Sequence, residues 1–215
     1  HLSYRASLVY SVNDDVMLYG TISESYKTGG FNGEPQTPED AVVPYDEETA
    51  NNYEMGIKSE FNDRFRLNAT VFYVKYEDQQ VNVFRIGPSG FASQAIENAA
   101  KSDVLGLELD YVWQVSDMFR ISGNYARLDA EIKDTQLALG PGPPVDLDGK
   151  RPLNVPKWTG VLAADIEIPL SNGSRMVLRA DWRGRSAIYN NLRNTEEYRR
   201  PGTDLIGARL AWYSE

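Results

Sequence analysis

The chain has 215 residues and a formal net charge of −9, which argues against nucleic acid as a partner, because such binding depends on neutralising phosphates. It has no cysteine, which excludes a cysteine nucleophile and a disulfide framework. Its one histidine is His1, and a residue at the end of a chain is poorly positioned to act as a catalytic base. No stretch approaches the ~20 apolar residues of a membrane helix. We therefore expect a protein that is not an enzyme, with no cofactor, no metal and no catalytic residues.

Apolar and polar residues alternate along most of the chain, a period typical of β-strands. In chain order we expect nine strands, over residues 2–11, 16–26, 49–61, 65–78, 104–113, 119–132, 158–168, 175–189 and 203–213. Many are longer than the usual globular strand, and they suit a tilted crossing of a bilayer. Irregular segments are expected over residues 27–48, 79–99 and 140–156.

The lengths of the connections decide the architecture. Short and long connections alternate from the first expected strand to the last. A Greek-key sandwich has no reason to alternate in this way, whereas a barrel in the outer membrane has tight turns on one side and long loops on the other. The sequence therefore predicts an all-β protein, an antiparallel up-and-down transmembrane β-barrel.

The fifth expected strand shows how the faces divide. Its apolar side chains share one face: Leu105, Leu107, Leu109, Tyr111 and Trp113. Glu108 and Asp110 lie on the other face, and the expected strands at 158–168 and 175–183 repeat the pattern. We expect the apolar face to meet lipid and the charged face to line a polar lumen.

Tryptophans add a weaker signal. Trp158 follows a long loop, whereas Trp113 and Trp212 lie near the short turns, as expected for two aromatic girdles at the membrane interfaces. Trp182 falls in the middle of its expected strand and does not fit this arrangement.

Five stretches resemble the barrel of TonB-dependent outer-membrane receptors and occur in that family's order. They are SYKTGGFN (25–32), NNYEMGIKSEF (51–61), RLNATVFYVKYEDQQV (66–81), NAAKSDVLGLELD (98–110) and DGKRPLNVPKWTG (148–160). The resemblance implies a 22-stranded barrel in the bacterial outer membrane, in contact with lipids or lipopolysaccharide and closed by an N-terminal plug. It also implies uptake of a scarce nutrient, above all a ferric siderophore, energised through the plug by the inner-membrane TonB complex.

The chain departs from the family in extent. Nothing in it resembles a plug or a TonB-contact box, and about 24 residues per strand would require roughly 500 residues for 22 strands. We expect residues 1–215 to form a partial barrel domain of about nine strands, without the plug, because an open sheet in lipid would leave both edges unpaired. The glycines of the family motifs are expected to be architectural: Gly29, Gly30, Gly56 and Gly106. The alternatives are a passive porin or structural barrel, and a soluble all-β ligand-binding module whose apolar faces form a core.

Ligand contacts, if the chain belongs to a receptor, are expected in the long loops. For an anionic ferric chelate the candidates are Arg85, Phe91, Tyr189, Arg193, Tyr198, Arg199 and Arg200. For a glycan, stacking on Phe84, Phe91 or Tyr45 would matter more than charge. The segment LRNTEEYRRPG is equally compatible with a solvated loop of balanced charge.

Overall fold

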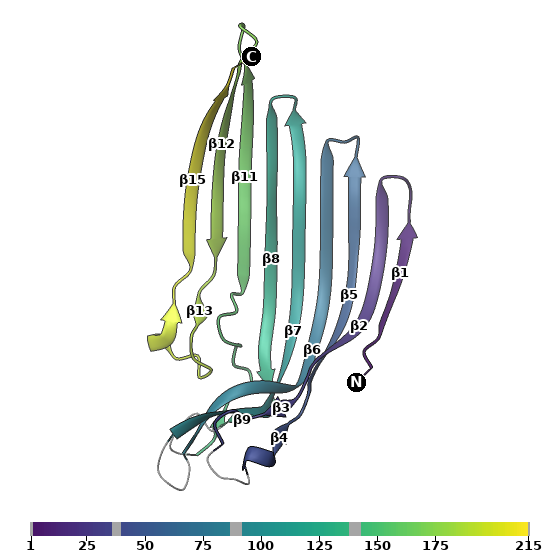
Figure 1. The fold of residues 1–215 in the computed structure, drawn as a ribbon. Helices are drawn as coiled ribbons and strands as arrows, with labels where there is room; N and C mark the ends of the chain where they lie inside the picture. The colour runs from purple at the N-terminus through teal and green to yellow at the C-terminus, as the bar shows by residue number, and fades with distance from the viewer. Residues whose placement is uncertain (1, 36–39, 87–91, 138–142, 215) are drawn as a thin grey trace.

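The structure is a computed structural model that describes residues 2–35, 40–86, 92–137 and 143–214, and its main feature is one antiparallel sheet of nine strands (Figure 1). In spatial order the strands are β1 (Arg5–Ser11), β2 (Val16–Lys27), β5 (Glu48–Phe61), β6 (Phe65–Ile86), β7 (Ala92–Ser116), β8 (Phe119–Lys133), β11 (Trp158–Pro169), β12 (Arg175–Arg185) and β15 (Thr203–Tyr213). Each strand pairs with its neighbours along the chain, so the predicted up-and-down meander is confirmed. The sheet is open, with β1 and β15 at its edges.

The connections β1–β2, β5–β6, β7–β8 and β11–β12 are short and lie at the upper end of the sheet in Figure 1. The long connections lie at the other end, where β6 and β7 also extend past the sheet. The turn between β5 and β6 has three residues: Asn62 and Asp63 both have positive φ, 51° and 53°, and the amide of Arg64 donates to the carbonyl of Phe61 at 3.0 Å. Asparagine and aspartate tolerate this left-handed backbone better than other side chains. The polar residues Asn62 and Asp63 therefore allow the tight turn that joins β5 to β6.

Small elements decorate the long-loop end. Three pairs of antiparallel strands, each strand two residues long, lie there: β3 (Gly30–Phe31) with β4 (Pro44–Tyr45), β9 (Gln136–Leu137) with β10 (Val145–Asp146), and β13 (Ile188–Tyr189) with β14 (Arg199–Arg200). Two short 3-10 helices, η1 (Asp40–Val42) and η2 (Glu196–Tyr198), lie in the same loops. No helix within the described ranges has the length and apolar character needed to cross a membrane.

The two faces of the sheet differ as the sequence predicts. Directly opposite residues share a face, and Leu107 lies opposite Val71 on one side, while Glu108 lies opposite Thr70. Large apolar side chains stay exposed on the face of Leu107: Leu8, Leu18, Ile22, Met55, Val71, Leu105, Leu162, Ile166, Leu178, Ile206 and Leu210. Leu105 is 52% exposed and Ile206 is 85% exposed. Among the described residues no second layer packs on this face, which is the arrangement of a lipid-facing wall and not of a soluble sandwich.

Aromatic pairs mark two levels of that outward face. At the short-turn end the rings of Phe61 and Phe65 stack at 6.4 Å, and Phe65 meets Trp113 edge-on at 6.3 Å. At the long-loop end Tyr53 stacks on Tyr73 at 6.4 Å. The eight residues from Phe65 to Tyr73 correspond to about 27 Å along a strand, or about 20 Å of depth at a tilt of about 40°. That spacing matches the apolar band of an outer-membrane barrel.

The expectation that Trp182 lies mid-strand is wrong. β12 ends at Arg185 and not at Tyr189, so Trp182 lies three residues from the end of its strand. Its ring stacks on Trp158 at 6.2 Å, and its indole N–H donates to Asp204 at 2.9 Å. Trp182 therefore belongs to the girdle at the long-loop end.

The expectation of an irregular segment over residues 79–99 is also wrong. β6 continues to Ile86 and β7 begins at Ala92, so the two strands form one long hairpin beyond the membrane. Its pairing shifts between Tyr76 and Gln79, where Asp78 has a φ of 52°. Such a bulge bends a hairpin, and in Figure 1 the end of β6 and β7 turns sharply away from the line of the sheet.

Polarity reverses between the two faces above the outer girdle. Lys75, Asp103 and Glu131 are directly opposite one another on the outward face. On β6 and β7 the preceding outward residues are Tyr73 and Leu105, whereas on β8 outward charges begin earlier, at Arg127. On the inward face, Ala130 and Ile132 are only 5% and 4% exposed. The strands thus leave the bilayer at this level, and from there their apolar side faces inward.

Candidate functional site

The long-loop end carries the candidate site, and a small apolar cluster holds its loops together. Val83 and Ala95 come from the bent hairpin, and Ile132, Leu137 and Leu147 come from β8 and the β9–β10 hairpin. Leu192, in the loop between β12 and β15, packs against the same cluster. The β6–β7 hairpin, the β8–β11 connection and the β12–β15 loop, which are far apart in sequence, therefore pack together at the long-loop end of the sheet, which we call the mouth.

Asn98 fixes another of these connections. Its amide nitrogen donates to the carbonyls of Asp46 and Asp78 at 2.9 and 2.8 Å, and its side-chain oxygen accepts from the amide of Asp46 at 2.7 Å. Gln80 adds donations from its side-chain amide to the carbonyls of Thr28 and Asp46, at 2.9 and 3.1 Å. These bonds fasten the ends of the β2–β5 loop to the bulge in β6.

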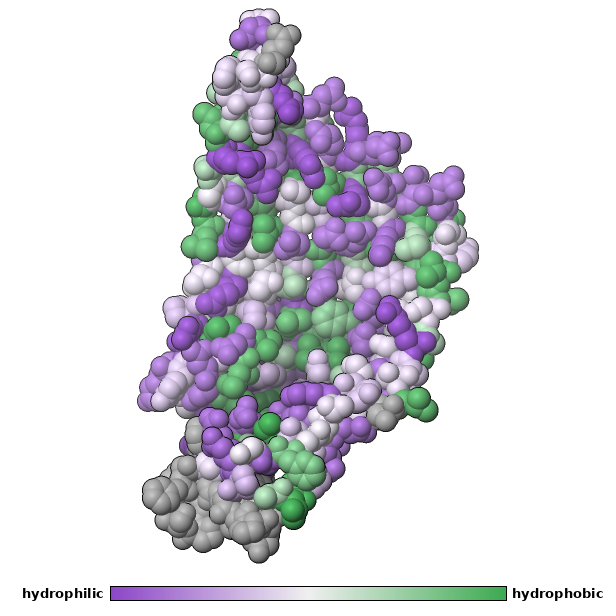
Figure 2. Space-filling model, viewed as in Figure 1, coloured by the Kyte–Doolittle hydropathy of each residue, from purple (hydrophilic) through white to green (hydrophobic). Residues whose placement is uncertain are grey.

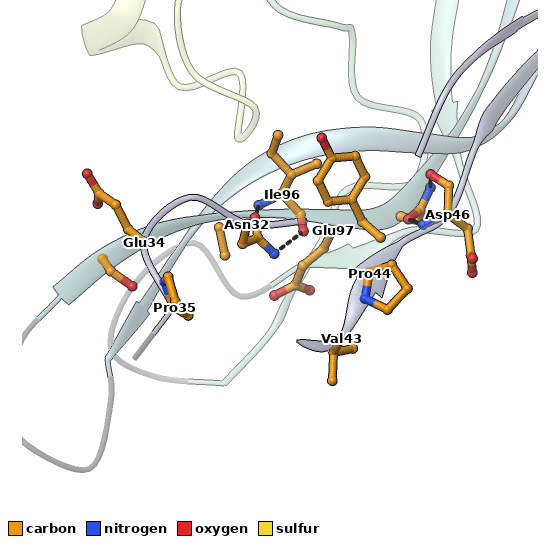
Figure 3. A pocket seen from close by; sticks show the side chains of 12 residues that line it. Asn32, Glu34, Pro35, Val43, Pro44, Asp46, Ile96 and Glu97 are labelled. Atoms are coloured by element: carbon orange, nitrogen blue, oxygen red, sulfur yellow. Dashed lines mark hydrogen bonds between the residues drawn. The ribbon is translucent and has the colours of Figure 1, made fainter. Parts of the chain in front are cut away.

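Asn32, in the β2–β5 loop, binds the backbone of β7 in a similar way. Its side-chain oxygen accepts from the amide of Ile96 at 2.6 Å and its nitrogen donates to the Ile96 carbonyl at 3.2 Å, as Figure 3 shows. Beside this contact lies a cavity of about 240 Å³ whose lining includes Tyr45 and Glu97. Tyr45 crowds Gly30, where an added Cβ would lie 2.7 Å from the phenolic oxygen. Gly30 therefore allows β3 and β4 to pair closely.

Asn194 anchors the loop between β12 and β15. It has a φ of 52°, its side-chain oxygen accepts from the amide of Arg151 at 2.7 Å, and its nitrogen donates to the Arg151 carbonyl at 3.1 Å. The guanidinium of Arg151 lies 5.8 Å from the ring centre of Tyr189 and donates to the carbonyl of Val155 at 2.9 Å. The segment DGKRPLNVP (148–156) thus stabilises the β12–β15 loop through the contacts of Arg151.

Sequence patterns did not single out these asparagines as anchors. Asn32 closes the stretch SYKTGGFN and Asn98 opens NAAKSD, so the residues that carry the family resemblance here hold loops in place. Their bonds join positions 64 and 52 residues apart. An asparagine that lies at the end of a family motif and next to a long loop is the sequence feature that could identify such an anchor.

The structure places five of the predicted ligand residues on one loop. The phenol of Tyr189 donates to Glu196 at 3.2 Å, and the guanidinium of Arg199 lies 3.9 Å from the same carboxylate. With its carboxamide oxygen turned toward Arg200, Asn190 accepts from that guanidinium at 2.6 and 3.1 Å. Arg193 and Tyr198 are exposed, and no ion pair involves Arg193 within the described part of the chain.

The remaining predicted residues lie on the bent hairpin or outside the description. Arg85 belongs to β6, two residues beyond the buried Val83, so its backbone adjoins the cluster that Leu192 joins. Phe91 lies outside the described residues. The hairpin therefore brings the position of Arg85 toward the loop of Arg193, although the two are more than 100 residues apart in sequence.

Charges around the mouth are mostly paired. Lys75 and Glu77 form an ion pair at 2.8 Å, and Lys133 pairs with Glu131. The hydrogen bond from Glu131 raises the pKa of the Lys133 ammonium above its usual range. The Asp146 carboxylate accepts from the amide of Asp148 at 2.9 Å, and the Asp148 carboxylate accepts from the amide of Asp134 at 3.2 Å, so both act as acceptors within turns.

The lumen face carries a polar network of its own, as predicted for Asp110. The side-chain amide of Asn68 donates to both oxygens of Asp110, at 3.1 and 2.9 Å. The guanidinium of Arg179 donates to both oxygens of Asp165, at 3.1 and 3.0 Å. Figure 2 shows hydrophilic residues spread over the face of the sheet in view.

Comparisons with known proteins agree with this geometry. The pesticin receptor of Yersinia enterocolitica is 35% identical over 125 residues, which are 57% of this chain and 18% of the relative. The metal-pseudopaline receptor CntO of Pseudomonas aeruginosa is 30% identical over 160 residues, 74% of this chain and 20% of the relative. This chain thus spans about a fifth of the length of these curated relatives.

Solved structures show the same fold. The ferric yersiniabactin uptake receptor FyuA from Yersinia pestis superposes with a TM-score of 0.76 at 23% identity, over 97% of this chain and 29% of the receptor. The ferric preacinetobactin receptor BauA from Acinetobacter baumannii gives 0.73 at 16% identity, over 98% and 29%. The family model for the TonB dependent receptor-like β-barrel matches residues 1–214. With its meander, its lipid-facing wall and this match, the chain belongs to the β-barrel domain of the TonB-dependent receptors, which are proteins of the outer membrane.

Proposed function

We propose that the whole protein imports ferric siderophores across the outer membrane. Energy would come from the TonB complex of the inner membrane, through a plug domain that lies outside residues 1–215. The observation that carries the proposal is the match of residues 1–214 to the receptor barrel, with siderophore and metal receptors among the relatives. Membership of this family favours gated import over the alternative of a passive porin or structural barrel.

Ligand capture in this proposal uses the mouth described above. Ferric siderophore complexes that are anionic favour guanidinium groups, which bind carboxylate and similar oxygens with two parallel donors. Arg193 and Tyr198 are exposed on the β12–β15 loop, beside Arg199, Arg200 and Tyr189. We include Arg85 of β6 and Phe91, which lies outside the described residues. The Leu192 contact supports this grouping, because it joins the loop to the hairpin.

A lipid contact completes the proposal. The outward charges just above the outer girdle, Lys75, Asp103 and Glu131, lie at the level of the outer-leaflet head groups. We propose that they contact lipopolysaccharide, whose phosphates and divalent cations suit side chains of both signs.

Uptake of labelled iron tests the function directly. The full-length receptor is produced in a Gram-negative strain that lacks its own siderophore receptors, with and without a working TonB complex. Cells are then offered iron-55 bound to yersiniabactin, pseudopaline, preacinetobactin or a catecholate. We expect accumulation for at least one chelate, only when TonB works. Uptake that does not need TonB would favour the porin, and no uptake of any chelate would remove the siderophore assignment.

A charge reversal tests the ligand site. We expect Arg193→Glu to weaken binding of the transported chelate about tenfold or more, the equivalent of ~1.4 kcal/mol, because a charge-assisted bond is replaced by repulsion. Lys101→Glu is the matched control, since Lys101 is also exposed but lies on the outward face of β7. Equal effects of the two variants on chelate affinity, measured by radioligand binding to outer membranes, would contradict the placement.

A further inference from the structure

A second cavity lies at the mouth, apart from the one beside Asn32. Its volume is about 370 Å³, and four segments line it: the start of β5, the β6–β7 hairpin, β8 with the connection that follows it, and the β12–β15 loop. Ile132, one of the lining residues, shares the lumen-facing side of β8 with Ala126, which lies opposite Glu108. The cavity therefore lies on the inward side of the sheet.

Apolar side chains form the floor of this cavity. Ile132, Leu137 and Leu147 belong to the buried cluster that joins the loops of the mouth, and Leu137 and Leu147 are only 2% and 1% exposed. Leu153 and Leu192 also line the cavity. Leu153 differs from the floor, because 43% of this large apolar residue stays exposed. An apolar group in the cavity would take Leu153 out of water, which favours binding.

Polar side chains of the lining are engaged within the protein. The side-chain oxygen of Gln79 accepts from the hydroxyl of Ser102 at 2.9 Å, and the carboxylate of Glu48 accepts from the amide of Gln80 at 2.9 Å. No lysine or arginine is among the described residues that line the cavity. An anion here would meet the carboxylate of Glu48 and no counter-charge. The cavity therefore suits an uncharged apolar group, as most ligand pockets do over the greater part of their lining.

Arg193 is held at the edge of this cavity. Its neighbour Leu192 lines the cavity and packs against the buried cluster. Its other neighbour, Asn194, is fixed by the two hydrogen bonds with the backbone of Arg151, and the amide of Asn194 donates to the carbonyl of Asn191 at 3.2 Å. Arg193, which is exposed, thus extends from a backbone that is anchored on both sides. An anchored cation loses less freedom when it binds an anion.

We propose that the mouth binds a ligand with two unlike parts: an uncharged apolar ring enters the cavity, and a neighbouring anionic group pairs with Arg193. Under the function proposed above, on which this assignment rests, the imported chelate carries such a ring beside its anionic groups. An apolar cavity of about 150 Å³ binds benzene, so a cavity of about 370 Å³ has room for a substituted ring. The ring covers Leu153, and the anion stays outside the cavity, away from Glu48.

An acid that carries one ring and no iron tests this assignment. The full-length receptor in lipid nanodiscs is added to para-fluorophenylpropionate, and the width of the fluorine NMR line reports binding. We expect broadening beyond that caused by empty nanodiscs, and we expect excess phenylpropionate but not propionate to reverse it. Leu153→Asn and Arg193→Gln should each weaken binding about fivefold or more, because each removes one of the two contacts.

Val42→Asn is the matched control. Val42 is also an exposed apolar residue at the long-loop end, but it does not line the cavity, so we expect its substitution to leave binding unchanged. Leu153→Met should keep binding, since it retains an apolar side chain of similar size. Heat-modifiable migration on gels checks that each variant is folded.

Three outcomes would overturn the assignment. One is binding that responds to only one of Leu153→Asn and Arg193→Gln, because two-part recognition needs both contacts. Another is equal weakening by Val42→Asn, and the third is no broadening beyond that of empty nanodiscs. Since the acid carries no iron, ring binding by a receptor that imports no chelate would support the cavity and refute the siderophore assignment. Uptake of a chelate without ring binding would do the reverse, so the two failures are distinguishable.

Discussion

Leu109 offers the sharpest test of which face of the sheet meets lipid. It lies on the outward face, four residues from Trp113 at the inner girdle and four from Leu105 near the outer girdle. Four residues correspond to about 14 Å of strand, or about 10 Å of depth at a tilt of about 40°. Leu109 therefore lies close to the bilayer midplane.

An arginine at the midplane of a barrel wall costs about 2–4 kcal/mol, so we expect Leu109→Arg to lower the free energy of unfolding by that amount. Glu108→Arg places the same side chain one residue away, on the lumen face opposite Thr70 and Ala126. There water solvates it, and we expect a change within about 0.5 kcal/mol.

The assay is denaturant unfolding of the full-length receptor in lipid vesicles, followed by tryptophan fluorescence and by heat-modifiable migration on gels. The comparison of adjacent positions removes any general effect of the added charge. Equal losses at positions 108 and 109, or a larger loss at 108, would refute the assignment of the faces.

Two further changes test the packing described above. Gly106→Ala should destabilise the barrel by about 1–3 kcal/mol, because its Cβ would lie 2.1–2.5 Å from the ring of Phe72; a Phe72→Leu background should restore much of the loss in the same unfolding assay, and an unchanged loss would argue against this contact. Asn98→Ala removes the acceptor of the Asp46 amide, so hydrogen exchange at Asp46 should become at least tenfold faster, while unchanged protection would mean that other bonds hold the loop.

The membrane-spanning part of the fold could be predicted because its pattern is local. Along the strand from Leu105 to Trp113, lipid on one side and water on the other impose a period of two residues, and that period alone identifies the strand and its faces. Trp182 shows the limit of this pattern. The sequence predicts a strand that continues to Tyr189 and places Trp182 in its middle, whereas the strand ends at Arg185.

Beyond the bilayer the pattern loses this constraint. The bulge at Asp78 shifts the period, and the outward side changes from apolar to charged, so the continuation of β6 and β7 could not be told from a loop. The anchors of the candidate site, Asn32 and Asn98, bond to segments distant in sequence. Nothing in their local context distinguishes such asparagines from those of an ordinary turn.

The reversal of polarity above the outer girdle also fixes how deep the barrel sits. Sinking toward the periplasm by one outward position would carry Lys75, Asp103 and Glu131 into the hydrocarbon. The cost of a lysine or arginine rises from about 0–1 kcal/mol near the interface to about 2–4 kcal/mol at the midplane, so resistance grows with every further step. Rising would expose the apolar band to water instead. The row of charges formed by Lys75, Asp103 and Glu131 thus limits how deep the barrel can sink, which keeps the long loops at a constant height above the membrane.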